Sequence, residues 1–307
     1  MVQKNSLKNK IIIICGPTAS GKTALAVECA KLLNSEVISA DSMYIYKDLN
    51  IGTAKPDLAE MQGVVHHMIN VVTPFDSFSV SDYKRLATPI IDDLIAKNKV
   101  PIICGGTGFY INSILYDLSY GQEQGNQAVR DKYNEIAKEK GNLYVYNILK
   151  EVDQESALKL HYNDLKRVIR ALELYESGVK KSELNDSLEP KYDYKAYLIN
   201  HPRTTLYDRI NYRVDKMFEN GLLEEIKSLI GLGLTKNNQC MQAIGYKEVI
   251  DYLEGVCTLD EAIDNIKLNT RHYAKRQITF FKKLNVCQLQ PNEVNILAKQ
   301  IVEGLDI

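Results

Sequence analysis

IIIICGPTASGKT, residues 11 to 23, is the stretch that decides the fold of this chain. Ile11 to Ile14 form a continuous β-branched run, typical of a strand buried on both faces of a parallel sheet. Gly16 to Thr23 then match G-x-x-x-x-G-K-[ST], the phosphate-binding loop motif, and helix-forming residues follow from Ala24 to Leu33. A strand, a glycine-rich loop and a helix in this order predict a binding site for a di- or triphosphate. We call residues Gly16–Thr23 the phosphate loop.

The phosphate loop also predicts how the anion is held. Gly16 and Gly21 can adopt dihedrals that residues with a Cβ avoid, so successive N–H groups can turn inward around an anion. The following helix N-terminus adds unpaired donors and the positive end of a dipole. Lys22 is expected on the terminal phosphate and the Thr23 hydroxyl on Mg²⁺. The residues expected to contact the diphosphate are Gly16, Thr18, Ala19, Ser20, Gly21, Lys22 and Thr23. The motif leaves the ligand and the reaction open.

Composition is that of an ordinary globular protein. The 307 residues are 45% hydrophobic and 25% charged, with a net charge of −1, so a polyanionic partner would have to be held by local basic patches. No apolar run is long enough to span a membrane, and the polar first residues MVQKNSLKNK do not fit a signal peptide. The six cysteines form no C-x-x-C pair, which favours reduced thiols and a cytoplasmic protein.

The order of patterns predicts an α/β fold. Glu36–Ala40 and Val100–Cys104 are further apolar strands, and the second runs into a Gly-rich turn and a helix, as the first strand does. This alternation indicates a parallel sheet of the P-loop NTPase type, flanked by helices. Between residues 118 and 197 the pattern becomes helical, with charged faces. We therefore expect a catalytic core at residues 1–117 and 198–307, and a helical insertion at residues 118–197.

Three turns should meet in one crevice, because ligands of open parallel sheets bind beyond the carboxyl ends of the strands. These are the phosphate loop, Asp41-Ser42 and Gly105–Gly108. Asp41 is a candidate general base or Mg²⁺ ligand, directly or through water, and its alternative role is to cap a turn. Thr107 is a candidate for a substrate phosphate or for a helix cap.

Basic residues gather on three helical faces. Arg209 and Arg213, one turn apart, are candidates for neutralising a developing negative charge, although a solvated helix face is the simpler interpretation. Lys166, Arg167 and Arg170 share one face of a second helix, and the segment 267–283 carries six Lys or Arg and no acidic residue. Both suggest a nucleic-acid track, while charge runs are more often merely solvated.

Together these motifs resemble the tRNA isopentenyltransferase family, over nearly the whole chain. GPTASGKT is followed by ISADSMYIYKDLNIGTAKP, and the later blocks resemble the family's motifs in order: GVVHHMINVVTPFDSFSVSDY, GGTGFYI, NDLKRVIRALE, DRINYRVDKM, QAIGYKE and RHYAKRQITFF. The resemblance is to the short bacterial form, since no Cys/His zinc module follows. Tyr44 stands where many members carry Gln.

The resemblance implies an activity and its residues. The family transfers a dimethylallyl group from dimethylallyl diphosphate to N6 of the adenosine immediately 3′ of the tRNA anticodon. It implies that Asp41 accepts the N6 proton, that Arg213 is the catalytic arginine, and that Lys22, Thr23 and Mg²⁺ neutralise the departing pyrophosphate. It also implies an enzyme that grips the anticodon stem-loop. Separately, we expect the chain to act as a monomer. The positions that match its tRNA contacts are Asp41, Ser42, Met43, Tyr44, Thr107, Arg130, Lys166, Arg167, Arg170, Gln242, Gly245 and Lys247.

Three other functions remain to be weighed. An adenine-nucleotide prenyltransferase would share the loop and Asp41, and the long basic insertion argues against it. A small-molecule P-loop kinase would share the loop alone and would need a nucleotide-base pocket. A nucleotide-dependent RNA-binding protein would have no use for a carboxylate beside the phosphate loop.

Overall fold

The computed structural model describes residues 9–118, 126–184, 187 and 189–305. The chain forms two compact units, one made of residues up to 115 and from 190 onward, the other of residues 116–189. Residues 190–197, which the sequence pattern assigned to the insertion, lie in the first unit. The reason is that Asp193–Ile199 forms a strand of its sheet.

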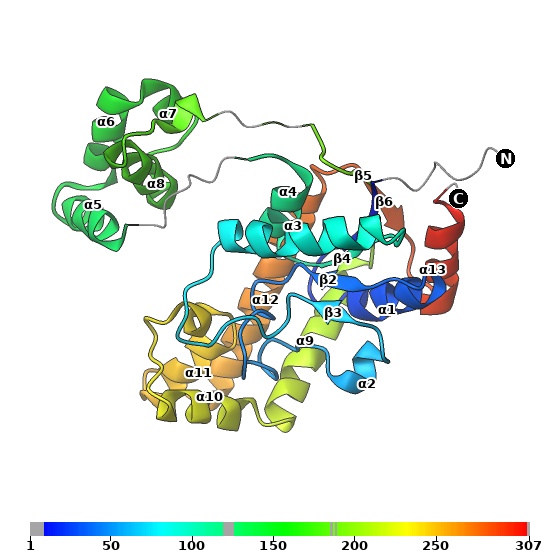
Figure 1. Cartoon of the computed structure of the whole chain (residues 1–307). Coiled ribbons are helices and arrows are strands. Elements are labelled where there is room, and N and C mark those ends of the chain that lie inside the picture. The colour runs from blue at the N-terminus through cyan, green and yellow to red at the C-terminus, as the bar shows by residue number, and fades with distance from the viewer. Residues whose placement is uncertain (1–8, 119–125, 185–186, 188, 306–307) are drawn as a thin grey trace. The chain divides into compact units, whose positions relative to one another are not determined.

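The first unit is built on a sheet of six parallel strands in the order β3-β2-β4-β1-β5-β6 (Figure 1). The strands are β1 Lys10–Cys15, β2 Val37–Ser39, β3 His66–His67, β4 Ile102–Gly105, β5 Asp193–Ile199 and β6 Val286–Leu289. β1 is central, and its Ile12 pairs with Ile102 on one side and Lys195 on the other. Ile11 to Ile14 are completely buried, so the predicted two-sided burial and the parallel α/β fold are confirmed.

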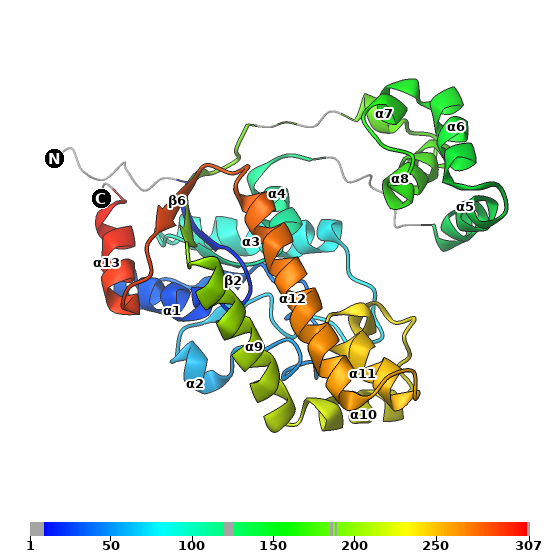
Figure 2. The same cartoon turned by 180° about the vertical axis from the view of Figure 1, so that it is seen from behind.

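Helices cover both faces of this sheet. α1 (Lys22–Leu32) and α13 (Val294–Glu303) lie side by side and share an apolar core with Ile12 and Ile14 of β1 (Figures 1 and 2). α3 (Val80–Ala96) and α4 (Gly108–Leu115) pack together through stacked Tyr83 and Tyr110 rings. The Tyr83 hydroxyl also donates to the Ser39 carbonyl of β2, which fixes α3 to the sheet.

Two long helices run together away from the sheet. α9 (Arg203–Glu219) and α12 (Leu259–Phe281) lie side by side in both views and bury Leu206, Ile210 and Ala274 between them (Figures 1 and 2). α10 (Leu222–Gly231) and α11 (Tyr246–Leu253) complete this group. The Thr258 capping box that the sequence predicts at the start of α12 is present, with Thr258 Oγ1 accepting from the Glu261 amide at 3.3 Å.

The stretch from residue 41 to residue 78 is mostly irregular, as expected. It contains only the short helix α2 (Leu58–Met61) and the two-residue strand β3. Its Asn50–Pro56 segment approaches α10 and α11, where Glu225 binds three of its amides. Hydrogen bonds from side chains such as Glu225 satisfy backbone amides of this long loop that would otherwise be paired in secondary structure.

The second unit is helical. It consists of α5 Gln127–Lys140, α6 Asn142–Val152, α7 Gln154–Leu158 and α8 Leu165–Glu176. Its own core includes Val145, Leu149, Val168 and Leu172, all with no exposed surface. The chain leaves and re-enters the first unit at one place, since the Lys191 amide donates to the Leu115 carbonyl at 2.7 Å.

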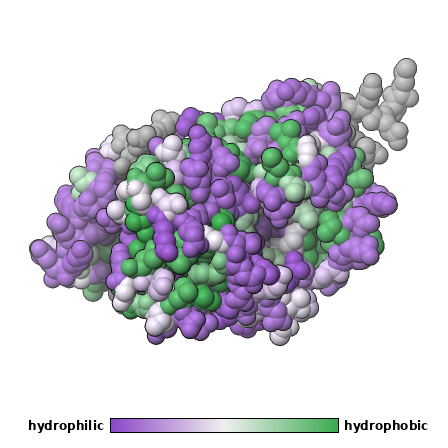
Figure 3. Space-filling model, turned by 90° about the horizontal axis from the view of Figure 1, so that it is seen from below, coloured by the Kyte–Doolittle hydropathy of each residue, from purple (hydrophilic) through white to green (hydrophobic). Residues whose placement is uncertain are grey.

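Within the described residues, no helix combines the length and the apolar content needed to cross a lipid bilayer. Seen from below, the surface is largely hydrophilic, with apolar side chains gathered in separate patches (Figure 3).

Candidate functional site

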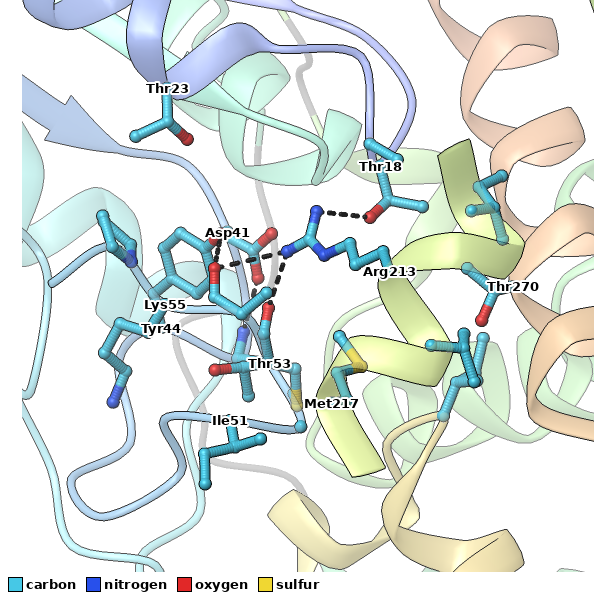
Figure 4. Close-up of a pocket in the computed structure, with 18 of the residues that line it drawn as sticks. Thr18, Thr23, Asp41, Tyr44, Ile51, Thr53, Lys55, Arg213, Met217 and Thr270 are labelled. Atoms are coloured by element: carbon cyan, nitrogen blue, oxygen red, sulfur yellow. Dashed lines mark hydrogen bonds between the residues drawn. The ribbon is translucent and has the colours of Figure 1, made fainter. Parts of the chain in front are cut away.

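A cavity of about 930 Å³ lies at the carboxyl ends of β1, β2 and β4. It is lined entirely by the first unit: by the phosphate loop, by Asp41 to Tyr44, by Asn50 to Asp57 and by side chains of α9 and α12 (Figure 4). The phosphate loop and Asp41, which follow different strands, therefore line one cavity, as the rule for strand ends predicts. The volume is in the range of small-molecule sites.

The phosphate loop is shaped by its glycines. Gly16 has φ +139° and Gly21 φ +91°, both in the region that favours glycine, and Ala19 shares it at φ +61°. The first amides of α1 have no intrahelical carbonyl to bond, as at any helix N-terminus. They are available to an anion in the cavity.

Side chains hold the loop's carbonyls away from that anion. Lys22 Nζ donates to the Pro17 carbonyl at 2.7 Å, and Arg209 Nε to the Ala19 carbonyl at 2.7 Å. His201 Nε2 lies 3.0 Å from the Ser20 carbonyl, where it donates as the Nε2–H tautomer. With three carbonyls engaged, the loop presents N–H groups rather than lone pairs to a ligand.

Lys22 and Ser20 are both poised for an anion. Burial lowers the pKa of Lys22 below its ordinary value, and the nearby Arg213 adds to this while Asp41 opposes it. The Ser20 hydroxyl is buried and has no hydrogen-bond partner among the described residues. Both groups line the cavity and would gain from an anionic oxygen.

Arg213 lies in the middle of the cavity (Figure 4). Its Nη1 donates to Thr18 Oγ1 at 3.3 Å, and its Nη2 lies 3.4 Å from the Thr53 carbonyl and 3.3 Å from the Ala54 carbonyl. The guanidinium thus joins the phosphate loop to the segment after Asn50. Arg209 lies one turn earlier and is more exposed; it also lines the cavity, and it donates to the Ala19 carbonyl of the phosphate loop.

The backbone two residues further along the chain holds the Asp41 side chain. Asp41 Oδ1 accepts from the Met43 amide at 2.9 Å, which is the turn-capping role given as its alternative, and the side chain also lines the cavity. The neighbouring Tyr44 hydroxyl donates to the Ala54 carbonyl at 2.8 Å. Burial raises the pKa of Tyr44 well above its usual range, so the hydroxyl stays a donor.

Thr107 supports Asp41 rather than the cavity. Its Oγ1 accepts from the Ser42 amide at 3.0 Å, which ties the turn after β4 to the turn after β2. Among the described residues Thr107 is not part of the cavity lining.

Glu225 fixes the segment that carries the two carbonyls bound by Arg213. Its carboxylate accepts from the amides of Asn50, Ile51 and Gly52 at 2.9, 2.7 and 3.1 Å, and from the Tyr246 hydroxyl at 2.6 Å. A Cβ on Gly52 would lie 2.6 Å from the Tyr246 ring, so only glycine permits this approach.

A buried lysine ends the same segment. Lys55 donates to the Tyr46 carbonyl at 2.5 Å and to Asn70 Oδ1 at 2.7 Å. Burial lowers its pKa to about 8.

In the insertion, the predicted tRNA contacts divide into two groups. Arg130 and Arg170 are both bound to Glu173, a carboxylate only 4% exposed, at 3.0 and 2.5 Å. Lys166 and Arg167 are exposed, and Arg167 makes only a peripheral ion pair with Asp164 at 3.4 Å. The shared basic face therefore contains residues with a structural partner and residues directed to solvent.

The three predicted tRNA contacts near α11 also differ in exposure and in their partners. Gln242 is exposed and lines the cavity. Gly245 is buried at the N-cap of α11, where its amide donates to Glu248 Oε2 at 2.8 Å. Lys247 lies 3.6 Å from the same carboxylate.

Two residues that the motifs did not single out bind segments that line the cavity: Gln277 accepts from the Thr18 amide at 2.9 Å, and Glu225 accepts from the Ile51 amide at 2.7 Å. Gln277 was detectable in principle: it falls three residues after Ala274 and four before Phe281, on the buried stripe of α12, where a polar side chain needs a partner. Glu225 gives no such signal, because it lies in the first turn of α10, where acidic residues are common for electrostatic reasons.

Comparisons with known proteins agree with this geometry. Residues 44–284 match the model of the family described as IPP transferase. The chain is 47% identical over 290 residues to a tRNA dimethylallyltransferase of Acetivibrio thermocellus, covering 93% of each, and 48% identical over 286 residues to one of Caldanaerobacter subterraneus subsp. tengcongensis, covering 89% of each.

Solved structures are similar too. The tRNA isopentenylpyrophosphate transferase of Bacillus halodurans has a TM-score of 0.72 and 39% identity, with 97% of each chain covered. A eukaryotic dimethylallyltransferase described as acting on tRNA has a TM-score of 0.80 and 30% identity, with 96% of this chain and 77% of that chain covered. On the strength of the family match and of relatives this similar over nine-tenths of its length, the chain belongs to the IPP transferase family.

Proposed function

We propose that the protein is a tRNA dimethylallyltransferase, which moves a dimethylallyl group from dimethylallyl diphosphate to N6 of the adenosine 3′-adjacent to the anticodon. One observation carries this proposal: the phosphate loop and Asp41 line a single cavity, with the Arg213 guanidinium between them. This shared lining supports a reaction in which pyrophosphate leaves from the phosphate loop while an amine approaches beside Asp41.

The proposed step is a substitution at an allylic carbon. N6 of the adenine forms a bond to C1 of the dimethylallyl group while the C1–O bond breaks, and its electron pair leaves with the pyrophosphate. The N6 proton passes to the Asp41 carboxylate. Lys22, Arg213 and the loop amides bind the anion more strongly as its charge grows, which is where electrostatic stabilisation accelerates a reaction.

Apolar side chains complete a site for the prenyl group. Ile51, Met217 and Ile266 line the same cavity as the loop. They offer a surface to a hydrocarbon tail beside the polar anion site, whereas a phosphoryl acceptor in a kinase would need polar partners there. This favours a prenyl donor over the kinase alternative.

The residues present fit a bound Mg²⁺. Thr23 and Asp41 supply oxygen atoms at the cavity wall, and within the described part of the chain no group of three His, Cys, Asp or Glu could enclose a metal. Mg²⁺ is commonly held by one or two protein oxygens together with substrate phosphates. When bound, the ion would supply positive charge to the pyrophosphate. Thr23 would hold it directly and Asp41 through water.

The RNA substrate is supported by two independent features. The insertion carries the exposed cations Lys166 and Arg167, and the eukaryotic neighbour is described as acting on tRNA. A base in an anticodon loop is accessible once it is unstacked, as in other base-modifying enzymes. One chain supplies every residue of the cavity lining, so we take a monomer to be sufficient, and we place it in the cytoplasm, where unmodified tRNA and reduced thiols occur together.

The test is turnover by the purified full chain. With Mg²⁺, dimethylallyl diphosphate and an unmodified tRNA whose anticodon is followed by adenosine, we expect release of pyrophosphate and a mass gain of one dimethylallyl group on that nucleoside. The same tRNA with guanosine at that position is the control and should yield no product. Turnover with AMP but not with tRNA would identify a nucleotide prenyltransferase, and ATP-dependent phosphorylation a kinase.

A further inference from the structure

Gln277 joins two loops that leave different strands. Its side chain is only 5% exposed. Oε1 accepts from the Thr18 amide of the phosphate loop at 2.9 Å, and Nε2 donates to the Gly106 carbonyl, after β4, at 3.0 Å. The orientation of the amide is fixed by its partners, because an N–H requires the oxygen and a carbonyl requires the NH₂ group. Both ends of one buried side chain are therefore committed.

The surroundings leave this amide one position. A Cβ on Gly106 would lie 2.1 Å from Gln277 Nε2 and 3.4 Å from the Gly16 carbonyl, so the missing side chain of Gly106 makes the space that Gln277 occupies. Tyr273, one turn earlier on α12, interacts with both Gln277 and Thr107, and burial raises its pKa to about 12. Gln277 is thus held between the turn after β4 and its own helix.

This contact redefines the role of Thr18. The sequence predicts that Thr18 contacts the diphosphate, but its N–H is already bound by Gln277 and its hydroxyl accepts from Arg213. The amide of Thr18 is already bonded to Gln277, so the donors left for an anion are those nearer α1. The hydroxyl of Thr18 serves to hold the guanidinium.

We propose that Gln277 is a positioning residue for diphosphate binding, which sets the conformation of the phosphate loop and, through Thr18, the position of Arg213. The proposal rests on the proposed function, since it takes the diphosphate of the prenyl donor as the ligand of the loop. It assigns to α12 a task in anion binding that is separate from contact with RNA.

The direct test is pyrophosphate affinity. Gln277→Met keeps the shape and removes both hydrogen bonds, so we expect calorimetry with Mg²⁺-pyrophosphate to show a Kd about tenfold higher, the effect of one to two hydrogen bonds. Gln277→Glu keeps an acceptor for Thr18 but adds a negative charge, so its loss should be larger. Gln300→Met, on the exposed side of α13, is the matched control and should bind as the wild type does.

Steady-state kinetics separate positioning from simple destabilisation. For Gln277→Met we expect KM for dimethylallyl diphosphate to rise about tenfold, kcat at saturating donor to change less than about threefold, and tRNA affinity to stay unchanged. A merely structural role would instead lower Tm and impair tRNA binding as much as donor binding.

A double-mutant cycle tests the link to Gly106. Gly106→Ala should raise the Kd for Mg²⁺-pyrophosphate by displacing the Gln277 amide, and it should cost markedly less in a Gln277→Ala background, where that amide is gone. Losses that simply add, or wild-type pyrophosphate affinity in Gln277→Met, would overturn the proposal. If the wild-type protein itself failed to bind Mg²⁺-pyrophosphate, the proposed function would fall instead.

Discussion

Arg213 Nη1 donates to the Thr18 hydroxyl at 3.3 Å, while the other arm of the same guanidinium faces the carbonyls of Thr53 and Ala54 (Figure 4). The cation is thereby held beside the phosphate loop before any substrate binds. Preorganised charge of this kind does not have to be reorganised as the leaving group develops.

Arg213→Lys should therefore lower kcat strongly. A lysine cannot reach both partners with one planar fork, so we expect a loss of about 10² to 10³ in kcat and a smaller change in KM. Arg209→Lys is the comparison on the same helix. Arg209 also lines the cavity, but among the described residues it hydrogen-bonds only the Ala19 carbonyl, so its effect should be smaller. If Arg209→Lys lowered kcat more than Arg213→Lys does, Arg209 would be the arginine that stabilises the leaving group.

Asp41→Asn should separate chemistry from binding. The asparagine oxygen can still accept from the Met43 amide, so the turn should survive, but the side chain cannot take up a proton. We expect kcat to fall by about 10²-fold or more, with pyrophosphate affinity and Tm nearly unchanged. An unaltered kcat would remove Asp41 from the role of general base and leave it as the cap of its turn.

Glu225→Gln should loosen the segment on which Arg213 rests. An NH₂ group would face backbone N–H donors or the Tyr246 hydroxyl, which costs roughly 1–3 kcal/mol of folding free energy and should lower kcat/KM for the donor. Glu224→Gln, the exposed neighbour in the same helical turn, is the control for charge and should cost less than about 1 kcal/mol by urea denaturation. Equal effects would show that the amide contacts of Glu225 carry no special weight.

The exposed cations of the insertion should bind RNA through its phosphates. Lys166→Glu with Arg167→Glu should weaken tRNA binding and make the dependence of log Kd on log salt less steep. Lys138→Glu, also exposed on the insertion, is a control for net charge. Arg170→Gln should act differently, lowering the stability of the insertion, because it leaves the buried Glu173 with one cation fewer. Unchanged tRNA affinity in the double variant would locate the RNA elsewhere.

Lys55 predicts a pH dependence of stability. Its pKa is about 8 in the folded protein and near the usual 10.5 when unfolded, so the unfolded state binds more protons between these values. The contribution of Lys55 to the free energy of unfolding should therefore rise with pH across this window, by on the order of 3 kcal/mol. Urea denaturation of the wild type and of Lys55→Met at pH 7.5 and pH 10 measures this contribution as the difference between their free energies of unfolding. A difference between the two proteins that is the same at both pH values would contradict the prediction.

The phosphate loop and Asp41 were predictable because each is local. A motif of eight residues dictates the loop, and the rule for strand ends brings Asp41 to it without knowledge of any long-range contact. The roles of Glu225 and Gln277 were not predictable from the sequence. Their partners lie about 175 and 259 residues away in the chain, and only packing brings them together. Their side chains have no short motif to mark them.

The charged helix α8 of the insertion shows a second limit of prediction from sequence. A run of basic residues does not reveal which of them face solvent, and α8 carries both kinds. The spacing of Arg170 and Glu173, one turn apart, was the available sign of an internal ion pair. Arg130 could not have been recognised in this way, because it reaches the same carboxylate from another helix, α5.

The hydrogen bond from the Lys191 amide to the Leu115 carbonyl joins the two points at which the chain departs for the insertion and returns from it. Because these two points are already hydrogen-bonded to each other, a short turn can replace the insertion while β5 keeps its pairing with β1. The insertion can therefore change in sequence or length while the cavity, which residues of the first unit line, keeps its shape.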